Sequence, residues 1–391
     1  MASALLVALV PGGRAAPAVQ WFVGNDAPAW SPSGSSIAFT AFRRGHAGEI
    51  YVMRANGTGQ RNLTRHPSYD DLAAWSPDGT RIAFTSNRNG NDDVYVMNAD
   101  GSRQTRLTTA EAGDYAPSWS PDGRRLAFWS SRDGNPEIYT MAADGSDQRR
   151  LTFGPAPDQS PDWGPDGRIV FVTSRDAGNR TVLYVMNGDG SAQHMVTPAS
   201  ADWSESRPVW SPDGTKIAFV SSRDFPVDNT EIYEMNADGT DETRITRSPR
   251  RDDWPTWSPD GARIAFSHGA LLTPEIYRIN ADGSGIRLLS RKKPVLESRF
   301  LLAPDPLAGR RYPVTLGVTT GTGASVQGAT ASCTATLGTT RLRLAARAFT
   351  SSRARCVWIL PRTASGRLLD VTIGARLGDS TVTEGFRVGV R

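Results

Sequence analysis

Acidic residues recur at one place in this sequence, four or five positions before each of six regularly spaced tryptophans. The tryptophans are Trp30, Trp75, Trp119, Trp163, Trp210 and Trp257, and the acidic residues before them are Asp26, Asp70 or Asp71, Asp114, Asp158, Glu205, and Asp252 or Asp253. Six carboxylates arranged around one rim would form a negative funnel that favours a cation, an amine or a basic peptide. The alternative is structural, because an Asp in a loop often caps backbone amides and can also pair with a neighbouring repeat.

A second chemical feature is an arginine at a fixed place in the four central repeats. These residues are Arg88, Arg132, Arg175 and Arg223. Their recurrence predicts ion pairs with the same carboxylates, and we expect these pairs to lock neighbouring repeats together. The first repeat (Ala41 to Arg44) and the sixth (Ser267 to Gly269) depart from this pattern, so the irregularity falls where the two ends of a closed ring would meet.

The elements that must position these residues can be identified from the second repeat. Strands are expected at 73–75, 81–85, 93–97 and 105–108, because β-branched and aromatic residues alternate there with Gly-bearing turns. In the turn Ser76-Pro77-Asp78-Gly79, Pro presets φ and Gly accepts a positive φ. Runs such as Ile82-Ala83-Phe84 are apolar on both faces, as in strands packed between neighbouring sheets.

The spacing of the tryptophans, 44 to 47 residues, predicts an all-β fold containing a six-bladed β-propeller. A single unit of this size cannot bury its apolar face, so the units must stack in a ring, with the tryptophans in structural positions. Each repeat supplies four strands in one phase. We therefore expect the ring to close without strand exchange, with residues 286–290 as the outer strand of the sixth blade and Val19 to Phe22 as the competing segment.

The remainder of the chain divides into three further segments. Residues 1–18 resemble a signal peptide because they contain an apolar stretch and the small-residue pattern Ala16-Pro17-Ala18, and the stretch is too short to span a bilayer. The propeller is assigned to residues 19–293, followed by a linker at 294–299. Residues 300–391 lack the tryptophan motif, and their length suits a small immunoglobulin-like β-sandwich.

Both cysteines of the chain, Cys333 and Cys356, lie in this last segment. In an exported chain they predict an intradomain disulfide, and two buried free thiols are the alternative. The same segment carries 12 Arg against three Asp and one Glu. These arginines are scattered without interleaved aromatic residues, so nucleic-acid binding is not expected.

The repeated string Trp-Ser-Pro-Asp-Gly-x-x-Ile-Ala-Phe, followed by Ile-Tyr-x-Met-Asn-Ala-Asp-Gly and Arg-Leu-Thr, resembles the TolB-type, WD40-like propeller repeat over residues 26–290. The family includes a periplasmic protein of a cell-envelope complex that binds a lipoprotein at its propeller. The resemblance therefore implies a six-bladed propeller in an exported protein that binds a partner. It is specific for the fold and less specific for function.

Catalysis is less well supported by the sequence. Peptidases with such propellers need a hydrolase domain, but the chain contains no Gly-x-Ser-x-Gly motif. The four histidines, His46, His66, His194 and His268, fall in different repeats and are expected to be exposed loop residues rather than metal ligands. The Asp-Gly turns lack the ligand spacing of a calcium loop.

We therefore expect a non-enzymatic, exported, monomeric scaffold that needs no cofactor or metal. Its partner would be a protein or a cell-envelope polymer bound at the channel rim. A propeller-based polysaccharide lyase, or another carbohydrate-active enzyme, is the alternative.

Overall fold

The structure is a computed structural model that describes residues 24–43, 47–178, 180–199, 202–223, 229–269, 273–290, 296–302, 310–320, 329–337, 339–350, 353–365, 367–377 and 380–390. The chain forms two compact units, residues 1–291 and 292–391. The signal-like segment 1–18 and the competing strand Val19 to Phe22 lie outside the described residues. Within the described part, no helix is long and apolar enough to cross a membrane.

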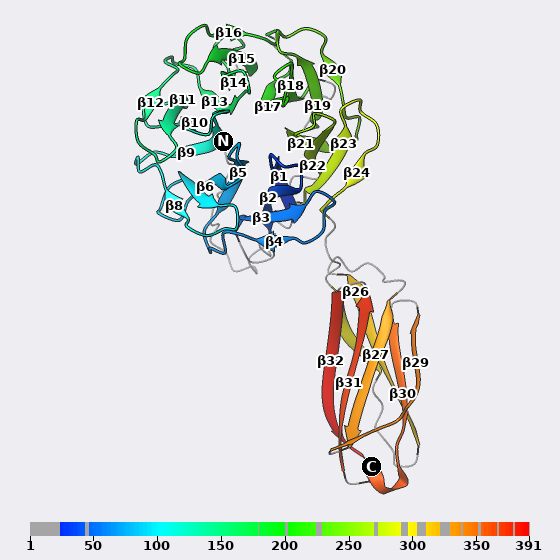
Figure 1. Cartoon of the computed structure of the whole chain (residues 1–391). Coiled ribbons are helices and arrows are strands. Elements are labelled where there is room, and N and C mark those ends of the chain that lie inside the picture. The colour runs from blue at the N-terminus through cyan, green and yellow to red at the C-terminus, as the bar shows by residue number, and fades with distance from the viewer. Residues whose placement is uncertain are drawn as a thin grey trace, which may run out of the picture. The chain divides into compact units, whose positions relative to one another are not determined.

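The first unit is a ring of six four-stranded antiparallel sheets around a central channel (Figure 1). The strands of blades one to three are β1 (Gly24–Trp30), β2 (Ser36–Phe42), β3 (Glu49–Arg54), β4 (Arg61–Asn62), β5 (Asp70–Trp75), β6 (Arg81–Ser86), β7 (Asp93–Asn98), β8 (Thr105–Arg106), β9 (Asp114–Trp119), β10 (Arg125–Ser130), β11 (Glu137–Ala142) and β12 (Arg149–Arg150). In each blade the first strand lies nearest the channel and the fourth lies at the outer edge (Figure 1).

Blades four to six repeat this order. Their strands are β13 (Asp158–Trp163), β14 (Arg168–Thr173), β15 (Val182–Asn187), β16 (His194–Met195), β17 (Glu205–Trp210), β18 (Lys216–Ser221), β19 (Glu231–Asn236), β20 (Thr243–Arg244), β21 (Arg251–Trp257), β22 (Arg263–Gly269), β23 (Glu275–Asn280) and β24 (Arg287–Leu288). The outer strand of the sixth blade therefore lies where the sequence predicted it, within residues 286–290.

One backbone hydrogen bond, repeated at every junction, closes the ring. The amide of the first or second residue of each inner strand donates to a carbonyl in the preceding blade, for example Asp70 to Gly48 and Asp114 to Asp92, both at 2.8 Å. At the junction of blades six and one, the Asn25 amide donates to the Pro274 carbonyl at 2.7 Å. The closing junction is therefore made by the same contact as the other five.

The second strands and the tryptophans build the core between blades. Phe84 and its five counterparts are fully buried. Six apolar clusters each combine residues of two adjacent blades, and one of the six tryptophans belongs to each cluster or packs against it. The indole nitrogens of Trp75 and Trp119 donate to the carbonyls of Ala29 and Ala74 in the preceding blade, at 3.2 and 3.1 Å. The structural assignment of the tryptophans is thus consistent with their contacts.

The Ser-Pro-Asp-Gly segments form the expected turns. In blade two the Gly79 amide donates to the Ser76 carbonyl at 2.8 Å, and Gly79 has a φ of +69°. The Asp78 carboxylate accepts the Ser76 hydroxyl and the Thr80 amide, and these hydrogen bonds lower its pKa to about 2. The outer turn of this blade requires Gly101, because a Cβ there would lie 2.7 Å from the Leu63 carbonyl oxygen of blade one.

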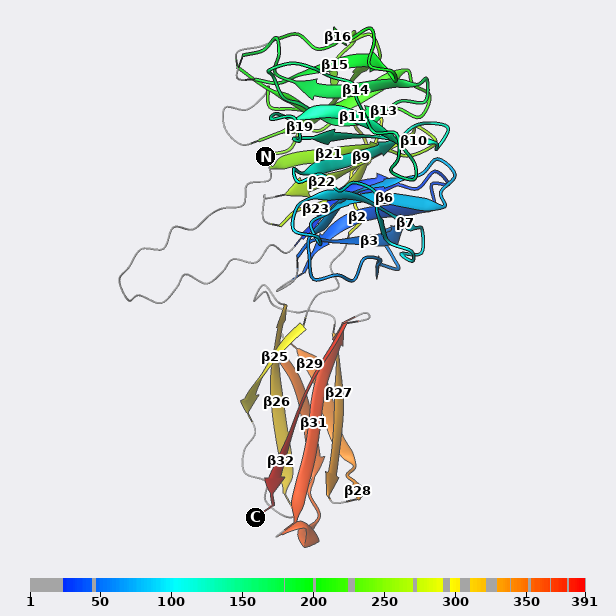
Figure 2. The same cartoon turned by 90° about the vertical axis from the view of Figure 1, so that its left-hand side faces the viewer.

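The second unit consists of two four-stranded antiparallel sheets, ordered β25-β26-β30-β29 and β28-β27-β31-β32. Their strands are β25 (Leu296–Leu302), β26 (Arg311–Thr320), β27 (Thr330–Leu337), β28 (Thr340–Arg341), β29 (Leu344–Thr350), β30 (Arg353–Ile359), β31 (Leu368–Leu377) and β32 (Ser380–Gly389), with a short 3-10 helix η1 at Arg362–Ala364. The strands run along the length of this unit (Figure 2). Strand β25 begins within residues 294–299, the segment expected to be a linker.

The two sheets share one apolar core and one covalent bond. The core combines Trp358 and Ala354 of β30 with Leu369, Val371 and Ile373 of β31. Cys333 on β27 and Cys356 on β30 form a disulfide that joins the two sheets, with their Cα atoms 6.0 Å apart. The disulfide prediction is confirmed, while the immunoglobulin-like assignment stays a prediction.

Candidate functional site

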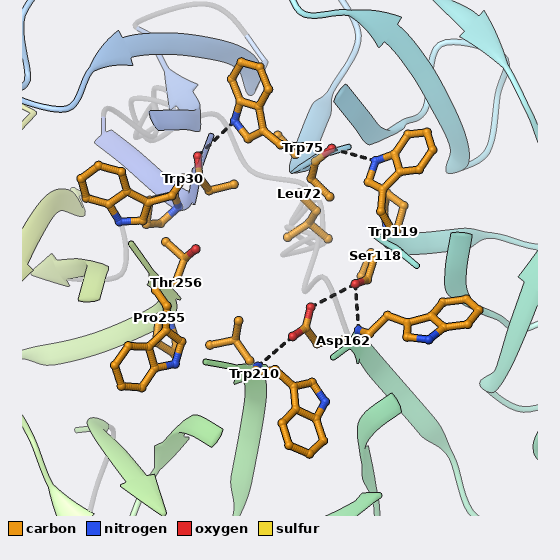
Figure 3. Close-up of a pocket in the computed structure, with 18 of the residues that line it drawn as sticks. Trp30, Leu72, Trp75, Ser118, Trp119, Asp162, Trp210, Pro255 and Thr256 are labelled. Carbon is orange, nitrogen blue, oxygen red and sulfur yellow. Dashed lines mark hydrogen bonds between the residues drawn. The ribbon is translucent and has the colours of Figure 1, made fainter. Parts of the chain in front are cut away.

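The central channel holds a cavity of about 540 Å³, lined by the inner strands β1, β5, β9, β13, β17 and β21 and by the prolines of the following turns. Figure 3 shows the tryptophan rings directed away from this cavity, whereas Leu72, Asp162 and Thr256 point into it. Most of the side chains that line the cavity are apolar, and many of them are small. Among the described residues that line it, Asp162 and Arg207 are the charged ones.

Each inner strand contains a bulge three residues before its tryptophan. The residues there have left-handed backbone conformations, with φ between 46° and 53°, and the pairing with the second strand shifts register at this point. These bulge residues are Ala27, Leu72, Ala116, Ser160, Arg207 and Trp254. Because a bulge re-aims the side chains next to it, the two positions before it have different environments.

The predicted rim residues fall into two sets, divided by these two positions. Asp114, Asp158 and Glu205 stand five residues before their tryptophans, in the same place as Asp70 and Asp252, and all five are buried. Asp26, Asp71 and Asp253 stand four residues before theirs, next to the bulge. The structure therefore does not bring the six predicted carboxylates into one ring.

The buried set is paired with the recurrent arginines. The distances are 2.9 Å for Arg88–Asp70, 2.8 Å for Arg132–Asp114, 2.5 Å for Arg175–Asp158 and 2.6 Å for Arg223–Glu205. Both partners belong to one blade in every case, so the expectation that these pairs lock neighbouring blades is wrong. The reason is topological, because the loop after the second strand folds back beside the start of the inner strand of its own sheet.

In blade two, the contact to the neighbouring blade is made by a glutamine. The Arg88 guanidinium donates to Gln104 Oε1 at 2.7 Å, and Gln104 Nε2 donates to the Leu63 and Thr64 carbonyls of blade one at 3.3 and 3.2 Å. Gln193 repeats this in blade four, where its Nε2 donates to the Leu151 carbonyl at 3.3 Å. The arginine thus acts across the junction through a neutral side chain.

The first and sixth blades fill the same place with other residues. In blade one Arg43 donates to Asn25 Oδ1 at 2.9 Å, so this blade keeps the arginine and exchanges the carboxylate for an amide. In blade six His268 Nδ1 lies 2.6 Å from Asp252 Oδ1. The prediction that His268 is an exposed loop residue is wrong, because it lies on β22 and its side chain is largely buried.

Two carboxylates of the second set, Asp26 and Asp71, belong to a cluster at the channel entrance. The entrance is the end of the channel at which the inner strands begin. We define this entrance cluster as Asp26, Asp71, Asp92, Tyr69 and Tyr115. All five residues are half-buried. Tyr69 is hydrogen-bonded to Asp71, and Tyr115 to Asp92. The two tyrosines and Asp92 were not found from the sequence, because they stand at places where the other repeats carry different residues.

Burial and neighbouring charges raise the pKa of two carboxyl groups of the entrance cluster, those of Asp71 and Asp26. Burial raises the pKa of Asp71 to about 8, the Tyr69 hydroxyl opposes this, and the charges of Asp92 and Asp26 add to it. Burial also raises the pKa of Asp26, the hydrogen bond with Ser267 and the charge of Arg207 oppose this, and the charge of Asp253 adds to it. Among the described residues, no ion pair includes Asp26, Asp71 or Asp92. The cluster therefore has no ion-pair partner among the described residues, although the charge of Arg207 acts on Asp26.

Asp253 differs from the entrance cluster because it has cationic partners. It pairs with Arg207 at 2.9 Å and with Arg251 at 2.9 Å. The Arg207 guanidinium also lies over the Trp254 ring, 4.0 Å from its centroid. The predicted rim residue Asp253 is thus neutralised on its own side of the entrance. Within the described part of the chain, no group of three or more His, Cys, Asp or Glu side chains could hold a metal ion.

The sequence of the propeller matches the profiles of two families of β-propeller domains. The sequence profile of the TolB beta propeller domain matches residues 3–115 and 199–299, and that of the Tricorn protease N-terminal beta propeller domain matches residues 90–204. Comparison with curated protein sequences gave no match.

Three solved structures illustrate the likeness in fold. A putative TolB from Agrobacterium tumefaciens is 26% identical, with a TM-score of 0.51 over 61% of this chain and 87% of that one. TolB from Acinetobacter baumannii is 21% identical, with a TM-score of 0.52 over 67% of this chain and 62% of that one, so this chain spans less than two thirds of it. An oligogalacturonate lyase in complex with manganese is 13% identical, with a TM-score of 0.51 over 88% and 91%. At this identity the lyase shows a shared fold alone.

Proposed function

Since the chain belongs to the family of the TolB beta propeller domain, we propose that it is a non-enzymatic, exported scaffold whose channel entrance binds a basic segment of a protein partner. The disulfide fits an exported protein, because such bonds form and persist in oxidising compartments. The two TolB structures support a propeller used as a scaffold.

The observation that carries this proposal is the unbalanced charge of the entrance cluster. The charges of Asp92 and Asp26 raise the pKa of Asp71, and the described residues supply these three carboxyl groups with no ion-pair partner. A cationic group placed there would relieve this repulsion and lower the pKa of Asp71 and Asp26. Binding of a basic segment should therefore release protons, and it should become tighter as the pH rises from 6 to 9.

The test uses a synthetic ten-residue peptide with four lysines and the same peptide with four glutamates. We expect the lysine peptide to bind. Its affinity should fall as salt is added, because salt screens charges and the Debye length is about 8 Å at physiological ionic strength. The variant Asp26→Asn/Asp71→Asn/Asp92→Asn should bind it at least ten-fold more weakly, mainly through slower association. Fluorescence anisotropy and stopped-flow kinetics measure both quantities.

A matched control separates local from overall charge. Asp144→Asn/Asp189→Asn/Asp238→Asn likewise replaces three carboxyl groups by amides, at exposed turns of blades three, four and five. This control should bind the lysine peptide like the unaltered protein. The proposal fails if the glutamate peptide binds as well as the lysine peptide, or if the entrance variant and the control bind alike.

A further inference from the structure

Asp162 is a carboxylate on the wall of the channel, on β13 immediately before Trp163. Its side chain points into the cavity (Figure 3). The corresponding positions of the other five inner strands carry uncharged side chains, namely Ala29, Ala74, Ser118, Val209 and Thr256. A charge at this depth is therefore a feature of blade four and does not belong to the repeat.

Two hydrogen bonds fix the orientation of this carboxylate. Asp162 Oδ1 accepts the Ser118 hydroxyl at 3.0 Å, and Oδ2 accepts the Trp210 backbone amide at 2.8 Å. Ser118 in turn accepts the Trp163 amide at 3.0 Å. The carboxylate thus connects inner strands of three consecutive blades. Each of its oxygens keeps acceptor capacity for a further donor.

The described residues give Asp162 no cationic partner. Arg207, the other charged residue of the cavity wall, is paired with Asp253. Burial raises the pKa of Asp162 to about 6, opposed by the hydrogen bonds from Trp210 and Ser118, and no other charged group contributes. A carboxylate held in a largely apolar channel without a counter-charge is costly unless a partner supplies one.

The repeat itself changes around this residue. Gly164 stands where the other five turns carry Ser, and a Cβ there would lie 2.9 Å from the Trp210 ring. The Trp163 indole donates to the Gly167 carbonyl of its own turn at 3.1 Å, instead of to the preceding blade as in Trp75 and Trp119. Two departures from the repeat in this blade thus lie next to the carboxylate.

We propose that Asp162 anchors a subsite inside the channel for a primary ammonium group, such as a lysine side chain or a free amino terminus of a bound segment. The cavity of about 540 Å³, with Leu72 and Val209 on its wall, has room for the aliphatic stem of such a group. A compact ammonium is the simplest ligand, because it needs only one of the remaining acceptor positions, whereas a planar guanidinium fork needs one on each oxygen. This subsite rests on the channel being the binding site, but it does not require the entrance cluster.

The test uses n-pentylamine, with 1-pentanol as its uncharged counterpart. Binding is followed by the shift of the Trp210 amide in two-dimensional NMR spectra of the full chain. We expect pentylamine to saturate in the millimolar range at pH 7.5, pentanol to bind at least ten-fold more weakly, and pentylamine affinity to fall about ten-fold at pH 5, where Asp162 is protonated.

Two variants distinguish a binding role from a structural one. Asp162→Asn removes the charge and should abolish both the amine preference and its pH dependence. Ser118→Ala removes one hydrogen bond to the carboxylate, and it should keep amine binding within about three-fold if Asp162 acts as the anchor. Chemical unfolding of both variants checks that each is folded.

The outcomes also separate this proposal from the preceding one. The entrance variant Asp26→Asn/Asp71→Asn/Asp92→Asn should still bind pentylamine, whether or not it binds the lysine peptide. The subsite is overturned if the unaltered protein shows no saturable binding of pentylamine, if pentanol binds equally well, or if Asp162→Asn binds pentylamine as tightly as the unaltered protein does.

Discussion

The propeller and the second unit stabilise their interiors by opposite means. Every blade of the propeller buries polar or charged side chains, among them Asp70, Asp114 and Glu205. In the second unit, none of the residues whose exposure is described is a buried polar or charged one, apart from the half-cystine Cys356. Each blade of the propeller is a single thin sheet with a small apolar core, and buried ion pairs help to hold its strands and loops in place. The two facing sheets of the second unit can rely on a shared apolar core and one disulfide.

The propeller also contains a second row of buried ion pairs, between the third and fourth strands of its blades. Examples are Arg106–Asp93 at 2.7 Å, Arg150–Glu137 at 2.7 Å and Arg244–Glu231 at 2.8 Å. Blade four replaces both partners at once, with Val182 and Met195 at these places. This exchange of both partners indicates that a blade tolerates apolar residues at these two places.

The largest effect is expected from breaking one buried pair of the propeller. Arg132→Ala leaves the fully buried Asp114 carboxylate without its partner. We expect the free energy of unfolding of the propeller to fall by about 3–5 kcal/mol, because an uncompensated charge remains inside. Calorimetry of the full chain measures the loss, and we expect the two units to unfold as separate transitions.

Two further variants sharpen this comparison. Arg149→Ala breaks an exposed pair with Asp147, in which the side chains are 67% and 41% exposed, and it should lower the free energy of unfolding far less than Arg132→Ala does. Arg132→Met with Asp114→Leu should recover most of the stability, because apolar residues of similar volume can replace a buried ion pair without loss. Equal losses for the buried and the exposed arginine would show that burial does not decide the value of these pairs.

A loss of similar size, but in the other unit, is expected from the disulfide. Cys333→Ala/Cys356→Ala opens a link between residues 23 apart in sequence. Loop entropy predicts a loss of about 3 kcal/mol for the second unit. The propeller transition should stay unchanged in the same calorimetric scan. A shift of both transitions would contradict the view that each unit keeps its own stabilising device.

The smallest effect is a dependence on pH at the channel entrance. The pKa of Asp71 in the folded protein is about 8, above the ordinary value of 3.8, so the folded state binds more protons than the unfolded state between these values. Stability therefore falls as the pH rises through this range, and the penalty is fully present above pH 8. Asp71→Asn should be more stable than the unaltered protein at pH 9 by on the order of 1–3 kcal/mol.

The control for this effect is the same comparison at pH 4, where Asp71 is protonated in the folded state and the difference should nearly vanish. Urea unfolding curves of both proteins at the two pH values measure it. If Asp71→Asn destabilises the protein equally at pH 4 and pH 9, the Asp71 carboxyl is not held in its protonated form by burial.

Much of the fold could be predicted from the sequence, because the turns repeat. Trp, Pro and Gly recur at fixed distances, so the number of blades, their four strands and their closure follow from local geometry. The phase of the carboxylates could not be predicted, because residues such as Leu72 and Arg207 adopt left-handed conformations without any glycine to mark the bulge. A carboxylate five residues before the tryptophan is buried and paired, whereas one placed four residues before it lies at the channel entrance.

The remaining parts of the site have no counterpart in the repeat pattern. Asp162, Tyr69 and Tyr115 stand where other blades carry different residues, and Asp92 acquires its role only from the residues that surround it. A method that reads common features of repeats discards such positions. In a ring of similar blades, the residues that differ from their counterparts in the other blades are the best candidates for function.

The six bulges also bear on how such a channel could be diversified. The left-handed residues at these bulges are as different as Ala27, Ser160, Arg207 and Trp254, yet the backbone has nearly the same φ at each of them. Hydrogen bonds between strands and blades, rather than the identity of these side chains, therefore enforce the shape. Six positions facing one cavity can thus vary independently, as in a combinatorial library displayed on a constant frame. A new specificity could arise by substitutions at the bulges while the blades themselves stay as they are.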